Sequence, residues 1–374
     1  MPFVPITLIV ALLHLYIGWR LVPQFEGGLG WGLAAVLVAS TVLMPMGFMA
    51  RRVKKDRHRA EALAWAGFIF MGLFSSLFVL TLVREAVLLM GWAVGAGDEL
   101  GRLTAQGVPA LAGLVTLWGF VNARRRARVV SVEVPIAGLP SALEGFTIAQ
   151  ISDIHVGPTI KGPYLQAIVD RVNQLDADMV AVTGDLVDGS VRELGEHVAP
   201  LAHLRSRHGT FFVTGNHEYY SGAHAWIAEL RRLGIRVLLN EHTVLQHGAS
   251  PLVVAGVADY TAHLFDPSHR SDPALAIAGA PADAQMRVLL AHQPRSAEAA
   301  ERAGFQLQIS GHTHGGQFFP WNFFVPLQQP FTAGLHRLRS LWVYVSRGTG
   351  YWGPPKRLGA PSEITKLKLV AARG

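Results

Sequence analysis

Cysteine is absent from this chain of 374 residues. Its absence excludes disulfides and thiolate-bound metal, so any metal ion must be held by His, Asp, Asn or Glu. Charged residues are also scarce: Asp, Glu, Lys and Arg make up 16% of the chain, whereas 50% of the residues are hydrophobic. A chain of this length and composition is long enough for two or more domains with a sizeable core.

The second part of the chain has no excess of either charge sign. Residues 129–374 contain 20 Lys and Arg against 20 Asp and Glu, so the net charge of +7 lies entirely in residues 1–128, which contain 13 against 6. Nucleic-acid-binding domains usually carry a basic face, and a neutral segment does not indicate one. We therefore expect no nucleic-acid partner.

Long hydrophobic runs are confined to the first part and predict a membrane region. The predominantly apolar ranges are 3–22, 29–50, 62–83 and 108–123. A helix needs about 20 apolar residues to cross a bilayer, and only the last range is shorter than this. A cleaved signal peptide would explain the first range but not the other three. We predict a four-helix transmembrane domain at 1–128, in which residues 84–94 either extend the third helix or lie in the interface.

Basic residues flank these runs asymmetrically. They cluster at Arg51, Arg52, Lys54, Lys55, Arg57 and Arg59 after the second run, and at Arg124, Arg125, Arg126 and Arg128 after the fourth. Because positively charged loops stay in the cytoplasm, we expect the N-terminus and everything after residue 124 to be cytoplasmic. The sequence thus predicts a multi-pass protein of the inner (plasma) membrane.

The second domain, 129–374, is predicted to be α/β. Strands are expected first at 129–134, 146–151, 179–183, 210–214 and 235–239, with helices at 161–175, 193–206 and 222–233. Later strands at 252–257, 286–291, 305–309, 341–346 and 364–370 are assigned to a second sheet. Strands that alternate with helices indicate βαβ units. We expect a two-sheet α/β sandwich with helices outside and a site along one edge.

Polar residues of metal-binding type follow five of these strands. They are Asp153 and His155; Asp185; Asn216 with His217 and Glu218; His292; and, within Gly311-His312-Thr313-His314-Gly315-Gly316-Gln317, His312 and His314. Ligands gather at the carboxyl ends of strands in open α/β sheets, and glycines let the backbone pass close to an ion or a phosphate. A single His in such a turn is usually a solvated loop residue, but five clusters in order predict one metal site.

This set of residues suits the hydrolysis of phosphoesters. Phosphate oxygens repel a nucleophile and water is a weak one, whereas two divalent ions about 3.5 to 4 Å apart neutralise charge and activate water. Such a pair needs a carboxylate that bridges it, and Asp185 is the natural bridge. The ligand types suit manganese, iron or zinc.

The same ordered motifs carry a family resemblance. Asp153-x-His155, Gly184-Asp185, Gly215-Asn216-His217-Glu218, His292 and Gly311-His312-x-His314 resemble the motifs of the calcineurin-like metallophosphoesterases. Residues 311–317 followed by Ser346-Arg347-Gly348-Thr349-Gly350 are similar to the bacterial membrane-associated subgroup. The resemblance covers about residues 145–370. It implies a metallophosphoesterase fold with two ions, one held by Asp153, His155, Asp185 and His314, the other by Asp185, Asn216, His292 and His312.

His217 is left over once the ligands are assigned. The resemblance implies that it protonates the leaving oxygen or stabilises charge in the transition state, so we predict His217 and Asp185 as catalytic residues. Glu218 either orients His217 or is a helix N-terminal carboxylate. Asp188 is interpreted as closing a turn, and Arg347 as either a phosphate contact or a structural salt bridge.

The segment 318–327 follows the last ligands directly and is rich in aromatic residues and proline. Its sequence is Phe318-Phe319-Pro320-Trp321-Asn322-Phe323-Phe324-Val325-Pro326-Leu327. Such a segment is either an irregular loop that caps the core or an exposed apolar lip that touches membrane or an acyl chain.

These features predict a metal-dependent phosphodiesterase at the membrane surface. Its expected partners are the membrane and a phospholipid or lipid-linked phosphate substrate, with cleavage of a phosphodiester or pyrophosphate bond, as in a nucleotide-sugar lipid precursor. Two alternatives remain. One is the same chemistry on soluble nucleotides or phosphoproteins, with the helices as an anchor, and the other is a non-catalytic binding module.

Overall fold

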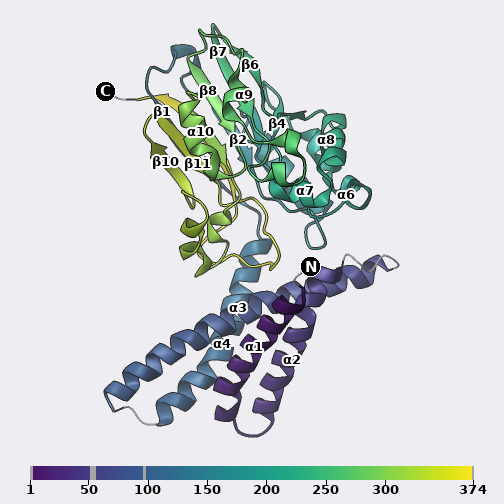
Figure 1. Ribbon diagram of the computed structural model, residues 1–374, viewed down its shortest axis with the longest axis vertical. Helices are drawn as coiled ribbons and strands as arrows, with labels where there is room; N and C mark the ends of the chain where they lie inside the picture. The colour runs from purple at the N-terminus through teal and green to yellow at the C-terminus, as the bar shows by residue number, and fades with distance from the viewer. Residues whose placement is uncertain (1–2, 51–55, 96–97, 373–374) are drawn as a thin grey trace. The chain divides into compact units, whose positions relative to one another are not determined.

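The computed structural model describes residues 3–50, 56–95 and 98–372, which form two compact units (Figure 1). The first unit comprises Met1–Arg124 and Gly353–Leu358, and the second comprises Arg125–Trp352 and Gly359–Gly374. The short segment Gly353–Leu358 thus packs with the helices, which its Gly- and Pro-containing sequence did not indicate.

Four long helices build the first unit. They are α1 (Phe3–Leu21), α2 (Gly28–Met49), α3 (Arg57–Ala93) and α4 (Asp98–Arg124). Each is long and apolar enough to cross a membrane, as predicted. Because α3 continues to Ala93 without a break, the apolar stretch after Arg84 and Glu85 extends the third helix.

The charged residues of α3 have partners inside this unit. Arg20 of α1 donates to both carboxylate oxygens of Glu85, from Nε at 2.8 Å and from a terminal nitrogen at 2.6 Å. Arg84 donates to the carbonyl oxygen of Gly101 at 3.0 Å. Ionisable groups inside apolar helices are tolerated when they are paired in this way.

A close backbone approach joins two of the helices, and side-chain hydrogen bonds join the segment Gly353–Leu358 to them. A methyl group on Gly67 of α3 would lie 2.5 Å from the Cα of Gly47 in α2, so only glycine allows this crossing. Lys356 donates from Nζ to the carbonyl oxygen of Gly72 at 2.8 Å and to Ser76 Oγ at 2.5 Å. The segment is therefore attached to α3 by hydrogen bonds as well as by packing.

The second unit contains two six-stranded sheets. The order in the first is β1 (Arg128–Ile136), β12 (Glu363–Ala371), β2 (Thr147–Ile151), β3 (Met179–Val182), β4 (Thr210–Phe212) and β5 (Arg236–Val237). The order in the second is β10 (Gly334–Leu338), β11 (Leu341–Val345), β9 (Leu307–Ser310), β8 (Met286–Leu290), β7 (Ser250–Gly256) and β6 (Glu241–His247). The helices are α5 (Gly162–Asn173), α6 (Val191–Val198), α7 (Asn216–Ser221), α8 (Ala223–Arg232), α9 (Pro273–Ile277) and α10 (Ala297–Arg302). The predicted two-sheet α/β architecture is confirmed.

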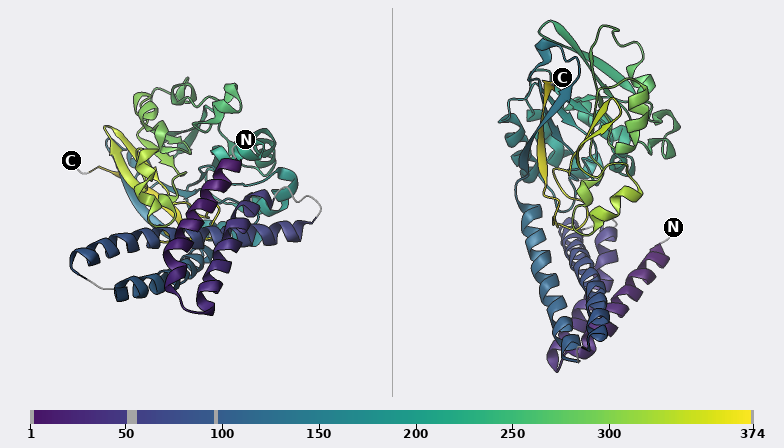
Figure 2. Two further views of the ribbon diagram at one scale, coloured as in Figure 1. Left: turned by 60° about the horizontal axis from the view of Figure 1, so that its bottom comes forward. Right: turned by 90° about the vertical axis from the view of Figure 1, so that its left-hand side faces the viewer.

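Three details of the prediction were wrong. Strand β12 was assigned to the second sheet, but it lies in the first, parallel to β1 and antiparallel to β2 (Figure 2, yellow beside blue). Strands β6 and β10 were not predicted, because their polar and partly exposed sequences hide the alternation of a strand. The helix predicted at 193–206 ends as α6 at Val198, since the next turn, Ala199–His203, is a 3-10 helix with a proline at its start.

One apolar core joins the two sheets. Ile148 and Phe211 of the first sheet are buried in the same cluster as Val254, Val288 and Tyr344 of the second. Packing of these side chains fixes the two sheets face to face. The turns that follow the carboxyl ends of the strands are therefore also fixed in position.

Candidate metal centre

Strand ends from both sheets supply the candidate metal ligands. In the first sheet, β2, β3 and β4 are followed by Asp153, Asp185 and Asn216. In the second, β8 and β9 are followed by His292 and His312. The structure thus brings together side chains that are up to 161 positions apart in the sequence, from Asp153 to His314.

The backbone at these turns is strained. Nine non-glycine residues with positive φ occur in the described part of the chain, and five of them are candidate ligands. These five are Asp153, His155, Asp185, His312 and His314, with φ between 50° and 72°. Such conformations cost free energy and persist where the surrounding structure enforces them, typically at functional sites. The strain therefore points to this edge of the domain independently of the residue types.

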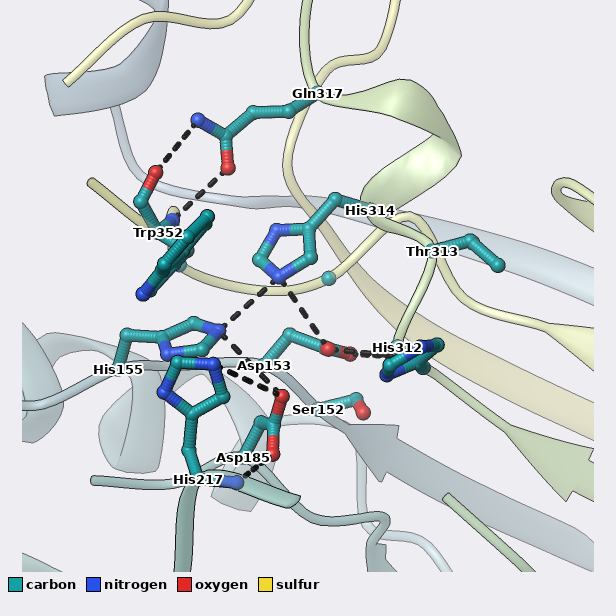
Figure 3. A network of polar contacts seen from close by, with 12 residues as sticks. Ser152, Asp153, His155, Asp185, His217, His312, Thr313, His314, Gln317 and Trp352 are labelled. Atoms are coloured by element: carbon teal, nitrogen blue, oxygen red, sulfur yellow. Dashed lines mark hydrogen bonds and ion pairs between the residues drawn. The ribbon is translucent and has the colours of Figure 1, made fainter. Parts of the chain in front are cut away.

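The ligand atoms form two separate groups, and Figure 3 shows the first of them around His314. In one, His314 Nε2 lies 3.1 Å from His155 Nε2 and 3.4 Å from Asp153 Oδ1. In the other, His292 Nε2 lies 3.1 Å from Asp185 Oδ2 and 3.1 Å from His312 Nδ1. Asp185 also belongs to a third group with His155 and His217. This third group shares His155 with the first group and Asp185 with the second, and so connects them.

The histidines of the second group differ in protonation. His292 Nδ1 donates to the carbonyl oxygen of Thr183 at 2.7 Å, which turns Nε2 toward Asp185 Oδ2. Burial opposes protonation of His292, but Asp185 outweighs it and raises the pKa of His292, so a metal ion would take the place of the Nε2 proton. Burial and the neighbouring His292 lower the pKa of His312 to about 3, so its ring is neutral at physiological pH. Neutral imidazole nitrogens are good ligands for divalent transition metals.

Asn216 provides a test of whether a cation fits. Its Oδ1 is buried and has no hydrogen-bond donor in the described structure. A buried amide oxygen without a partner is costly, and a divalent ion would satisfy it. Together with the imidazole and carboxylate atoms around it, this oxygen fits a metal site.

Two glycines are required by the packing of the turns. A methyl group on Gly215 would collide with Asp185 Oδ1, and one on Gly311 would collide with Asp153 Oδ2. The backbone of one turn thus touches the ligand of another, which is why glycine precedes Asn216 and His312.

Glu218 supports the turns and does not touch His217 in any described contact. Its buried carboxylate accepts hydrogen bonds from the backbone nitrogens of Asp185 at 3.0 Å, Leu186 at 2.8 Å and Gly215 at 2.6 Å. Of the two interpretations offered from sequence, the helix N-terminal carboxylate is the one that the structure shows. The three backbone contacts also connect α7 to the turn after β3.

Asp188 is the residue that orients His217, and the sequence analysis missed this role. Its Oδ1 accepts a hydrogen bond from His217 Nδ1 at 2.6 Å and lies 3.4 Å from His155 Nδ1. Burial opposes protonation of His217, but Asp185 and Asp188 outweigh it and raise the pKa of His217 to about 9. The only sequence signal was a second carboxylate three positions after Asp185.

Two aromatic rings flank His217. Trp352 and Tyr220 approach its ring edge to face, with centroid distances of 5.5 Å and 5.2 Å, and both remain partly exposed. The side-chain amide of Gln317 makes two hydrogen bonds of 2.9 Å with the backbone of Trp352 (Figure 3). Its nitrogen donates to the carbonyl oxygen of Trp352, and its oxygen accepts from the backbone nitrogen of Trp352. Nothing in the sequence indicated that Trp352 reaches the site.

Arg347 makes a structural salt bridge. It donates from its side chain to Glu363 Oε2 at 3.0 Å and from its backbone nitrogen to Glu363 Oε1 at 3.1 Å. Glu363 is buried and also accepts from Tyr344 at 2.8 Å. This network joins β11 to the start of β12, and it matches one of the two interpretations of Arg347.

Segment 318–327 forms an exposed lip beside the last ligands. Phe319, Trp321, Phe323 and Phe324 are 53%, 40%, 67% and 53% exposed, respectively. The segment is anchored by the buried Phe318 and by Gly316, where a methyl group would collide with Asn322. The interpretation as a core cap is therefore wrong for these four aromatic side chains.

Known proteins are similar to this chain over most of its length. The model of the calcineurin-like phosphoesterase family matches residues 146–316. A transmembrane protein with metallophosphoesterase domain from Bos taurus is 41% identical over 313 residues, which are 79% of this chain and 70% of the relative. An uncharacterized metallophosphoesterase from Campylobacter jejuni is 33% identical over 334 residues, 86% of this chain and 87% of the relative.

A distant likeness to solved structures concerns the fold alone. A putative 5'-nucleotidase from Staphylococcus aureus aligns with a TM-score of 0.39 and 15% identity, over 61% of this chain and 55% of the other.

Proposed function

The chain belongs to the calcineurin-like metallophosphoesterase family and is a metal-dependent phosphoric ester hydrolase, and we propose that it cleaves a phosphodiester or pyrophosphate bond in a lipid-linked substrate. The observation that supports this substrate class is the exposed aromatic lip, which follows His312 and His314 directly and packs on their turn. A nucleotide-sugar lipid precursor has the required chemistry.

The ligand groups suggest how metal ions are held. Asp153, His155 and His314 would bind one ion with Asp185, and the second would take Asp185 together with Asn216, His292 and His312. When bound, two such ions neutralise charge on the phosphate oxygens and activate water. Manganese, iron and zinc all suit these ligands.

His217 supplies a proton in this proposal. Asp188 accepts from Nδ1, so the ring is held with Nε2 on the side of Asp185, 3.9 Å from its Oδ2. The protonated ring donates from Nε2 to the leaving oxygen as the ester bond to phosphorus breaks. The raised pKa of His217 keeps this proton in place at neutral pH.

The apolar surface supports a lipid substrate. Fully burying a large apolar side chain among acyl chains contributes roughly 1.5 to 3 kcal/mol, so the exposed parts of the four aromatic residues of the lip would favour binding of an acyl chain. Trp352 and Tyr220 add an apolar wall next to His217, where the leaving group departs.

We also propose that the protein is a multi-pass protein of the inner membrane with its hydrolase unit in the cytoplasm. Arg124 ends α4 and Arg125, Arg126 and Arg128 follow it, and all four are exposed. Arg51, Arg52, Lys54 and Lys55 lie outside the described residues. Reporter fusions after residues 59 and 128 are expected to report a cytoplasmic position, and fusions near residue 97 the opposite side. A hydrolase unit on the outer side would overturn this orientation.

Substrate assays on the full-length protein test the proposed function. The protein in detergent, supplied with Mn²⁺, is expected to hydrolyse lipid-linked pyrophosphates or phosphodiesters far faster than nucleotides or phosphoproteins. Equal rates on soluble nucleotides and lipids would favour the helices as a simple anchor. Metal binding without turnover of any of these compounds would favour a binding module.

A further inference from the structure

A second group of metal-binding side chains lies outside the candidate metal centre. His224 stands at the start of α8, Asp266 directly precedes the 3-10 turn Pro267–His269, and His269 is the last residue of that turn. Their ligand atoms all lie within 4.8 Å of one another. Asp266 Oδ2 is 3.0 Å from His224 Nε2 and 3.9 Å from His269 Nε2. One carboxylate oxygen therefore faces two imidazole nitrogens.

The two oxygens of Asp266 have separate roles. Oδ1 accepts from the backbone nitrogen of Ser268 at 2.9 Å and from its hydroxyl at 2.6 Å, and so caps the turn. Oδ2 is left for the two histidines. The hydrogen bonds to Oδ1 fix the direction of Oδ2, as outer contacts do for carboxylates that bind metals.

The ring of His269 is held by a polar chain behind it. Its Nδ1 lies 2.8 Å from the hydroxyl of Tyr219, which in turn is 3.4 Å from Thr214 Oγ1. If the Nδ1 proton is donated to Tyr219, Nε2 has a free lone pair directed at Asp266.

We propose that His224, Asp266 and His269 bind a single divalent transition-metal ion, for which Zn²⁺ is the best match. Two imidazoles and one carboxylate are ligands for zinc, cobalt or nickel and not for magnesium or calcium. The side chain of His224 is 74% exposed and that of His269 is 13% exposed, so the remaining coordination position opens to water. No cysteine in the chain competes for the ion.

Occupancy of this site would stabilise the part of the hydrolase unit that carries His217. Tyr219 belongs to α7, two residues after His217, and packs on Phe265 at a centroid distance of 5.9 Å. An ion at Asp266 would join the start of α8 to the turn at 267–269, and through Tyr219 to α7. The role is structural, since no described contact connects the three ligands to Asp185 or His217.

A pair of matched variants separates this site from the main centre. Asp266→Asn keeps a side chain able to cap the turn but removes the anionic ligand, whereas Asp272→Asn makes the same change at the cap of α9, which accepts from Ala274 and Leu275. Full-length protein is stripped with chelator and reloaded with Zn²⁺, and metal per chain is measured by mass spectrometry. The parent and Asp272→Asn are expected to hold one more zinc than Asp266→Asn.

Thermal unfolding distinguishes a metal site from a surface ion pair. With Zn²⁺ at about 100 times Kd, the melting temperature of the parent is expected to exceed that of Asp266→Asn by roughly 5–10 °C, and the gap is expected to close in chelator. A gap of equal size in chelator would show an ion pair and overturn the proposal. Equal zinc content in Asp266→Asn and Asp272→Asn would also overturn the proposal. Binding of zinc to the parent only at millimolar Zn²⁺ would do the same. His269→Gln with His263→Gln as control repeats the test without changing a cap.

Discussion

The ligand turns and the aromatic lip, which directly follows the last of these turns, have opposite physical character. Asp153, Asp185 and His314 are buried, with strained backbones and hydrogen bonds from neighbouring turns. A few residues later, Phe323 and Phe324 expose most of their apolar surface. A buried, strained turn has one arrangement and supports one chemistry, whereas an exposed apolar surface can change without loss of the fold. The comparison teaches that turnover and substrate choice are separable by mutation.

Loss of the shared carboxylate is expected to have the largest effect. Asp185→Asn should abolish turnover of every substrate and lower the metal content, because Asp185 groups with His292 and His312 on one side and with His155 on the other. The fold should remain, since the change is isosteric. Hydrolysis rates and metal content are compared with Asp176→Asn, an exposed control. A variant with most of its activity and metal would contradict the assignment.

His217→Ala is expected to retain metal but to slow hydrolysis by ~10²-fold or more for poor leaving groups. A nitrophenolate leaving group needs no proton, so the loss should be smaller there. His203→Ala, at an exposed position, serves as the control. If both kinds of substrate lose the same factor, His217 does not act as an acid.

Asp188→Asn is expected to have a smaller effect, about tenfold, because the ring of His217 remains but loses its anionic partner. Activity that requires protonated His217 is present below its pKa and is lost as the pH rises through it. Since Asp188 raises this pKa, the variant should lose activity at a lower pH than the parent. An unshifted pH–rate profile would show that Asp188 only holds the turn.

A variant of the aromatic lip tests whether this surface determines substrate choice. Replacement of both Trp321 and Phe324 by Ser should reduce the rate on lipid substrates by about tenfold or more and leave a small soluble phosphodiester unaffected. Leu264→Ser with Leu275→Ser removes exposed apolar surface elsewhere and is the control. A stable lip variant with full lipid activity would exclude the role of the lip, and loss of both activities with a lower melting temperature would indicate a structural one.

Local patterns were sufficient to predict much of the architecture. Four apolar ranges predicted four long helices, and the strand runs predicted both sheets, because hydrophobic length and alternation are properties of neighbouring residues. The ordered strand ends also predicted which side chains would meet. Polar residues that end buried strands have few directions in which to point, so Asp185 and His292 were identifiable without coordinates.

Pairings over long distances in the chain were not predictable in this way. The position of β12 beside β1 depends on a register between residues 128–136 and 363–371, and no local signal encodes it. Trp352 lies 135 positions after His217 in the chain, and Gln317 bonds its backbone where its ring meets His217.

The sequence by itself determined the residue types of the site, the absence of thiolate chemistry and the division into apolar and neutral parts. Only the tertiary structure decided that Asp188 holds His217, that Glu218 supports the turns instead, and that the lip faces outward. The physical reason is that residue chemistry and periodicity are local. The direction of a side chain depends on what the rest of the chain places around it.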